Sequence, residues 1–254
     1  MDEVGGASVV GKALGLLDAL GSGRPAQSLS ALAARTGLPK STACRILRQM
    51  ETLGFVGRRD SLYTLGSRLR ELGTQAAISP YGRLRTASLG ELERLYDEAR
   101  TTVHLAVLSG AEVLYLEKIT APGGSRIPTQ VGLTAPAAHT AIGKAQLAYA
   151  GRAALEAVLR RPLAPPTQHS LRAPADLMEE LASVRAAGVA TDRGEFRADI
   201  SCVAAPIMVH GRPVAAISAS SVHGPAYTPQ RTSYVRDAAR RLSARLERLG
   251  TLSA

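Results

Sequence analysis

The chain has 254 residues, with 31 Lys and Arg against 21 Asp and Glu, and its formal net charge at pH 7 is +10. This length allows two domains with sizeable cores, and the positive charge predicts an acidic partner. The two cysteines form no CxxC pair, which excludes a zinc ribbon and a disulfide framework. No apolar run reaches the ~20 residues of a membrane-spanning helix, and the acidic N-terminus lacks the layout of a signal peptide. We therefore expect a soluble cytoplasmic protein without a membrane partner, a metal or a cofactor.

The first predicted helix follows Ser8, whose hydroxyl is suited to cap it. Apolar residues recur on one of its sides at helical spacing, namely Val10, Ala13, Leu14, Leu17 and Leu20. A stretch rich in glycine and proline ends the helix near residue 25. We expect this helix to pack against the two helices that follow it in the chain.

The stretch 28–65 predicts a helix, a tight turn, a second helix and a short hairpin. Gly37 supplies the turn, because glycine enters left-handed conformations at little cost. The second helix begins at or beside Pro39, and Gly54 closes it. Its apolar face consists of Ala43, Ile46, Leu47, Met50 and Leu53. This order of elements is typical of a winged helix-turn-helix.

The opposite face of the second helix carries Ser41, Arg45, Arg48 and Thr52. Six basic residues and one acidic residue lie between positions 35 and 59, and this local surplus of positive charge suits duplex DNA. The candidate DNA contacts are Lys40, Ser41, Thr42, Arg45, Arg48, Arg58 and Arg59. The alternative is an ordinary helical domain with solvated charges, and Arg48 in particular fits either interpretation.

From residue 79 onward, predicted helices and strand pairs alternate. Two hairpins are expected, from the strands 102–108 with 112–119 and 200–209 with 214–221. Helices are expected over 79–99, 140–150, 153–160, 174–187 and from Thr228 to the end. A further helix over 66–77 would connect the two blocks. This pattern predicts an α+β protein in which helices cover an antiparallel sheet.

Several motifs are similar to those of the IclR family of bacterial transcriptional regulators. They are GLPKSTACRILRQMETLGFV with YTLG at the front, and TAIGKAQLA, GVATDRGEF and CVAAPI with VAAISAS at the rear. The resemblance covers nearly the whole chain. It implies a winged helix-turn-helix DNA-binding domain (1–68), a linker helix (69–78) and a GAF-like α/β domain for effector binding and oligomerisation (79–254).

The resemblance also implies a function. The chain is expected to be a ligand-responsive regulator, a repressor, that binds a palindromic DNA operator as a homodimer or homotetramer and takes a small organic acid as effector. An activator of the same family is the alternative. Two positions depart from the pattern: Ala138 stands where a histidine is usual, with His139 one residue later, and Asp199 stands where a glycine is usual.

The effector site that the resemblance implies consists of Ala141, Ile142, Asp192, Cys202, Ser218 and Ser220. The residues themselves are consistent with it. A helix start offers unpaired N–H groups to a carboxylate, and serines two apart on a strand face the same side.

Other interpretations of these residues stay open. Cys202 alone is more often a small buried hydrophobe, the two serines suit a solvent-exposed sheet face, and Asp192 with Glu195 suits a turn. A thiol-dependent enzyme would use Cys202 with His139 and Asp192, but no further motif supports it, so we expect no enzyme. An architectural DNA binder is the third class, and it leaves the long rear domain without a role.

Overall fold

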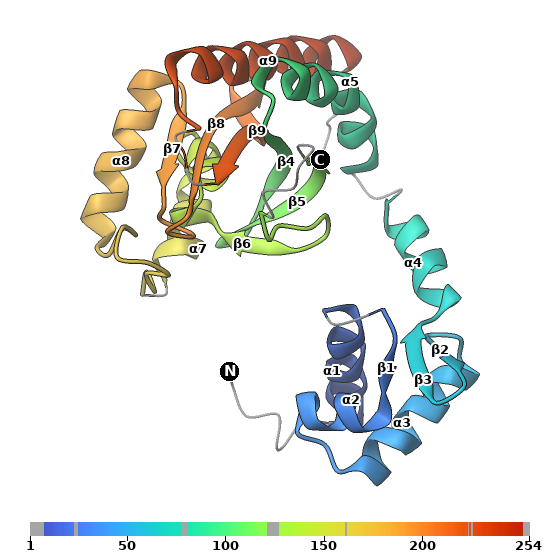
Figure 1. The fold of residues 1–254 in the computed structure, drawn as a ribbon. Helices are drawn as coiled ribbons and strands as arrows, with labels where there is room; N and C mark the ends of the chain where they lie inside the picture. The colour runs from blue at the N-terminus through green and yellow to red at the C-terminus, as the bar shows by residue number, and fades with distance from the viewer. Residues whose placement is uncertain are drawn as a thin grey trace. The chain divides into compact units, whose positions relative to one another are not determined.

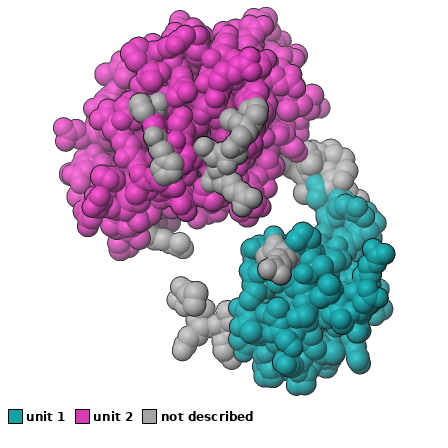
Figure 2. Space-filling view, viewed as in Figure 1, with its two compact units in different colours: residues 1–79 teal, residues 80–254 magenta. Residues whose placement is uncertain are grey.

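The computed structural model describes residues 8–22, 25–77, 81–120, 127–160, 162–222, 224 and 226–250, and of residues 74–77 it describes the backbone. The chain divides into two compact units, residues 1–79 and 80–254 (Figure 2). The α+β class is confirmed, with a winged helix-turn-helix in the first unit and a GAF-like antiparallel sheet with helices in the second. None of the described helices combines the length and the apolar character needed to cross a membrane.

The first unit holds three packed helices and a small antiparallel sheet with strand order β1-β3-β2 (Figure 1). Its elements are α1 (Val9–Gly21), β1 (Gln27–Ser28), α2 (Leu29–Thr36), α3 (Lys40–Thr52), β2 (Val56–Arg59), β3 (Leu62–Leu65) and α4 (Ser67–Ala77). The Ser8 hydroxyl accepts from the Gly11 N–H at 3.2 Å and caps α1. Gly37 ends α2 with a φ of +67°, as the turn requires.

The buried side of α1 agrees only in part with the predicted one. Leu20 is buried and Ala13 and Leu17 pack against the core as predicted, but Val10 and Leu14 are 68% and 56% exposed, and Leu16 and Ala19 are buried as well. Only the side of α1 that meets α2 and α3 is covered, and a helix that is apolar all round fits more than one stripe. Leu53 was also expected in the core but is 65% exposed, because it lies at the C-cap of α3.

The second unit is built on a six-stranded sheet with order β6-β5-β4-β9-β8-β7, in which every pairing is antiparallel. The strands are β4 (Thr102–Ser109), β5 (Glu112–Ile119), β6 (Thr134–Pro136), β7 (Ala190–Arg193), β8 (Ile200–Val209) and β9 (Arg212–Val222). The helices are α5 (Tyr81–Ala99), the short 3-10 helix η2 (Ala137–His139), α6 (Ala141–Leu147), α7 (Arg152–Leu159), α8 (Pro174–Ala187) and α9 (Pro229–Leu249).

Residues alternate between two cores on the two faces of this sheet. Val203 and Ile217 belong to the core under α5 and α9, which lie side by side across one face (Figure 1). Ala204 and Ala216 belong to the core formed with α6, α7 and α8 on the other face. The candidate site lies on this second face.

In the second unit both predicted hairpins are present with their turns, whereas three short elements were not predicted. These are β6, η2 and β7, which have three, three and four residues. Such short segments carry too few residues to show a period of their own. The edge strands β6 and β7 are defined by their pairing with β5 and β8, and this pairing exists only in the folded sheet.

Candidate functional site

Helix α3 presents the polar face that the sequence predicts. Ala43, Ile46 and Leu47 are buried against α1 and α2, and this fixes which way the helix faces. On the outside, Lys40, Ser41, Arg45 and Arg48 are exposed and Thr42 is half-buried. The arrangement therefore offers basic and hydroxyl side chains along one helix face, which is the shape and chemistry that a major groove accepts.

The two arginines of the wing lie at the tip of the β2–β3 hairpin and are both exposed. The Arg58 guanidinium lies 5.5 Å from the centre of the Tyr63 ring, and its Nε donates to Asp60 O at 3.1 Å. Tyr63 thus orients Arg58 on the surface of the wing, and Arg59 follows it on the same strand.

A cavity in the second unit brings together all six residues of the expected effector site. Ala141 and Ile142 begin α6, Asp192 on β7 pairs with Cys202 on β8, and the two serines of β9 complete the set. The space between these residues, together with the open solvent at its mouth, is about 350 Å³. Ser218 and Ser220 are 3% and 2% exposed, so they do not lie on a solvent-facing side of the sheet.

Seven further residues line the same cavity, and sequence reasoning did not single them out. They are His104, Tyr115, Ile127, Thr129, Thr140, Phe196 and Ile200. The strongest missed signal is His104, the one titratable residue within the largely apolar stretch 102–108. The register of β4 against β9 pairs His104 with Ser218, which only the folded sheet reveals.

His104 links three parts of the cavity wall. Its Nε2 lies 2.8 Å from Thr129 Oγ1, and its Nδ1 lies 3.5 Å from Ser218 Oγ and 3.4 Å from Ser220 Oγ. Burial, with the nearby Lys118 charge, lowers the pKa of His104 to about 3, so the imidazole is neutral at pH 7. A neutral imidazole has one donor and one acceptor nitrogen, and it therefore orients the hydroxyl groups around it.

Lys118 closes the wall from the outside. Its Nζ donates to Ile127 O and to Thr129 O, both at 2.7 Å, and so ties the segment that carries these two lining residues to β5. Burial lowers the pKa of this ammonium. Both acceptors are backbone carbonyl oxygens, which can accept hydrogen bonds from an ammonium.

Asp192 is 1% exposed and lies on β7, one residue before the strand ends and the turn begins. Its Oδ1 accepts from the Glu195 N–H at 2.6 Å. Burial raises the pKa of Asp192 to about 7, against the lowering effect of that hydrogen bond. Gly194 makes the turn possible, because it has a φ of +84° and a Cβ there would lie 3.1 Å from Ala198 O. The interpretation of Asp192 and Glu195 as a turn is thus correct, and the same turn lines the cavity.

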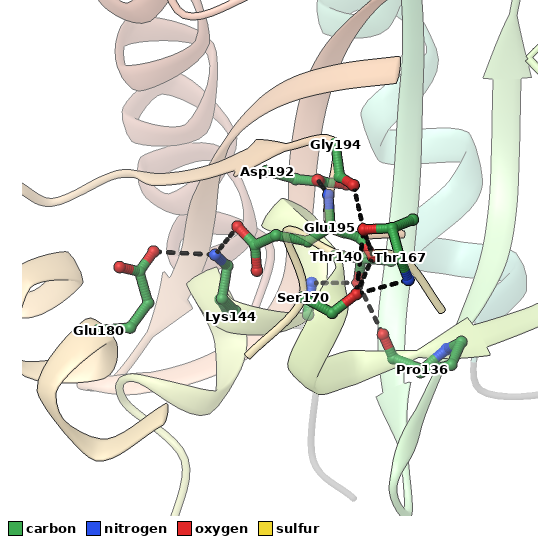
Figure 3. Close-up of polar contacts among 10 residues, drawn as sticks. Pro136, Thr140, Lys144, Thr167, Ser170, Glu180, Asp192, Gly194 and Glu195 are labelled. Atoms are coloured by element: carbon green, nitrogen blue, oxygen red, sulfur yellow. Dashed lines mark hydrogen bonds and ion pairs between the residues drawn. The ribbon is translucent and has the colours of Figure 1, made fainter. Parts of the chain in front are cut away.

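Figure 3 shows how this turn is held by the elements around it. The Thr167 hydroxyl donates to Gly194 O at 2.6 Å, and the Ser170 hydroxyl donates to Glu195 O at 2.6 Å. The side chain of Lys144, on α6, reaches Glu195 from the other side. The position of Asp192 therefore depends on the loop before α8 and on α6 as well as on β7.

Cys202 has none of the features of an activated nucleophile. Its Sγ donates to Ser220 Oγ at 2.9 Å, and burial raises the pKa of the thiol well above its usual range. The expected partner His139 does not line the cavity. Among the described residues, no group of three or more His, Cys, Asp and Glu side chains is placed to hold a metal ion.

Two family models match this chain. The model of the IclR helix-turn-helix domain matches residues 9–60, and that of the bacterial transcriptional regulator IclR C-terminal region matches residues 81–244. The chain belongs to the IclR family. Its winged helix-turn-helix is accordingly the DNA-binding part of a transcriptional regulator, and the membership that the motifs indicated is confirmed.

Individual relatives agree with this membership. The transcriptional regulator XynR of Escherichia coli is 31% identical over 220 residues, which is 84% of this chain and 85% of XynR. An IclR homologue from Microbacterium hydrocarbonoxydans, solved in complex with 4-hydroxybenzoate, is 30% identical, covers 95% of this chain and 100% of its own, and has a TM-score of 0.80. Thermotoga maritima IclR is 27% identical over 96% of this chain and 98% of its own, with a TM-score of 0.78. These relatives are regulators, so the expectation that the chain is not an enzyme is confirmed.

The two departures from the IclR pattern lie outside the cavity lining. Ala138 is buried in η2 among the apolar residues that pack against α6, and His139 follows it there. Asp199 lies before β8, where its Oδ1 accepts from Arg197 Nε at 3.2 Å. Neither Ala138 nor Asp199 is among the residues that line the cavity.

Proposed function

We propose that this IclR-family chain is a repressor that binds a palindromic operator as a homodimer or homotetramer and responds to a small organic acid bound in its second unit. The observation that carries the proposal is the convergence of six separately placed residues on one buried cavity. The domain ranges proposed for these tasks are 1–68 for DNA, 69–78 for the linker helix and 79–254 for effector binding and oligomerisation. An activator would use the same two units, but its binding to the operator would increase transcription.

The hydrogen-bond donors of the cavity suit the oxygens of a carboxylate as the effector group. Among the described residues that line the cavity there is no Lys or Arg, and the polar groups are hydroxyls, the Cys202 thiol, the neutral His104 and the carboxyl of Asp192. In the tautomer of His104 that is protonated on Nε2, only one of the two serines can donate to Nδ1, so the other keeps its O–H for a ligand. Backbone N–H groups at the start of α6 add further donors.

For the two units to act together, binding of the effector must change the affinity of the chain for its operator. Effectors of this kind shift the affinity of a second site by ~1–3 kcal/mol. The linker helix carries this bias in our proposal. Transcription from the chain's own promoter, measured with and without the effector, separates a repressor from an activator.

Arg45→Ala should lose roughly 1–3 kcal/mol of operator binding, because the exposed guanidinium of α3 reads a base edge. Fluorescence anisotropy titration of a promoter fragment at fixed salt measures the loss. Arg94→Ala, which removes one exposed charge from α5 in the second unit, is the matched control. Equal affinities for both variants would remove Arg45 from the contacts.

Ser220→Ala should weaken the ligand response at least several-fold while ligand-free operator binding stays intact, because the buried hydroxyl faces the cavity. A thermal-shift screen of small acids on the full chain identifies the ligand, with 4-hydroxybenzoate as the first probe because a related structure contains it. Ser183→Ala, on the exposed side of α8, is the control. A Ser220 variant that responds like the parent protein would place the effector elsewhere.

A further inference from the structure

Lys144 is the largest fully buried side chain among the described residues, with an exposed fraction of 0%. It lies on α6, between two carboxylates from different elements (Figure 3). Its Nζ is 2.8 Å from Glu180 Oε1 on α8 and 2.6 Å from Glu195 Oε1 in the turn after β7. The ammonium thus joins three segments that are 36 and 51 residues apart in the chain.

Stability alone does not explain these two ion pairs of Lys144. Burying a charged pair in an apolar core costs desolvation energy that its attraction seldom exceeds, and an apolar residue of similar volume is often at least as stabilising. The neighbours of Lys144 on α6, such as Ile142 and Ala145, pack into such a core. Glu195 Oε2 is also buried and has no hydrogen-bond partner among the described residues. The buried ion pairs are therefore better explained by the positions in which they hold the residues around them.

The residue that they hold in position is Glu195, in the turn after β7. The carboxylate of Glu195 is bound by Lys144, and the backbone N–H of the same residue donates to Asp192 Oδ1 at 2.6 Å. The hydroxyls of Thr167 and Ser170 hold the carbonyls of the turn but do not touch the Glu195 side chain. Lys144 is thus the described contact that fixes the orientation of Glu195 from the side of α6.

We propose that Lys144 is a positioning residue of the effector pocket, which holds Glu195 so that the Glu195 amide fixes the Asp192 carboxyl at the cavity wall. The inference rests on the proposed effector function for the role of the cavity. The positioning of Asp192 by Lys144 and Glu195 does not depend on any ligand. Glu180 binds the outer side of the ammonium, where its side chain is 30% exposed, and it does not reach Asp192.

Hydrogen exchange measured by mass spectrometry on the full-length, ligand-free protein tests the inference. In Lys144→Met, peptides spanning residues 190–198 should exchange about tenfold faster or more, because the amide of Glu195 loses its partner when the turn opens locally. Peptides from the centre of β8 and β9 should keep their parent rates. Lys144→Arg should restore slow exchange, and Glu180→Gln should leave the turn unchanged.

Glu195→Gln keeps the amide and the size of the side chain but removes the charge, so it should accelerate exchange in the same peptides by a smaller factor. This variant decides the test if Lys144→Met does not fold. Parent-like exchange at the turn in both variants, uniform acceleration across the second unit, or an equal effect of Glu180→Gln overturns the inference. If no acid shifts the melting temperature, the proposed effector fails while the exchange result stands.

Discussion

Gly143→Ala is expected to destabilise the second unit by roughly 3 kcal/mol, at the upper end of overpacking costs. Gly143 lies in α6, and a Cβ there would meet the backbone of Ala137, with the carbonyl carbon at 2.7 Å. The obstacle is backbone rather than a flexible side chain, so η2 or α6 must move. Both elements are buried, and Thr140 ties them by donating to Pro136 O and accepting from the Gly143 N–H.

Urea denaturation of the full chain, followed by circular dichroism, measures this loss. Gly90→Ala is the matched control, because Gly90 lies in α5 with nothing within 4 Å of the position of a Cβ. Alanine there should stabilise the helix by roughly 0.5–1 kcal/mol. If Gly143→Ala unfolds at the same urea concentration as the parent, then α6 does not approach η2 as closely as described.

Asp192→Asn is expected to become more stable than the parent protein as the pH rises. Burial raises the folded-state pKa of Asp192 from its ordinary value of 3.8 to about 7. The unfolded chain therefore ionises this carboxyl first, and the stability present below the unfolded pKa is lost as the pH rises to the folded pKa. Asparagine keeps an oxygen for the Glu195 N–H and carries no charge.

The advantage of Asp192→Asn over the parent should grow by roughly 2–3 kcal/mol between pH 5 and pH 8, since the folded carboxyl stays protonated over about two pH units of that interval. Urea denaturation of both proteins at the two pH values measures the difference. Asp97→Asn, at an exposed position of α5, should show no such change. A difference between Asp192→Asn and the parent that is independent of pH would mean that Asp192 is ionised in the folded protein at pH 5.

Local signals were enough for most of the elements. The hydroxyls of Ser28 and Thr228 accept from the N–H groups three residues on, as caps do. Gly37 and Gly188 end their helices at positive φ. These signals act through neighbours in the chain, so the sequence displays them without knowledge of the fold.

The site was only partly predictable. The six expected residues came from motifs that resemble a known family, and the cavity contains all of them. His104 and Thr129 were not expected, because their roles depend on which strands are neighbours and on the 2.8 Å contact between the two side chains. The roles of the proposed DNA contacts on α3 rest on the exposure of the helix face and stay predictions.

Motifs in the sequence indicated the family through their resemblance to known ones. The sequence by itself also determined the helix-turn-helix and both hairpins, because periodicity, caps and turns are encoded within a few residues of each other. Only the tertiary structure decided which face of α1 is buried, that β6 and β7 form the edges of the sheet, and that Lys144 lies in the core between two carboxylates. The physical reason is that burial, strand neighbours and ion pairs join residues far apart in the chain, and such contacts leave no local pattern.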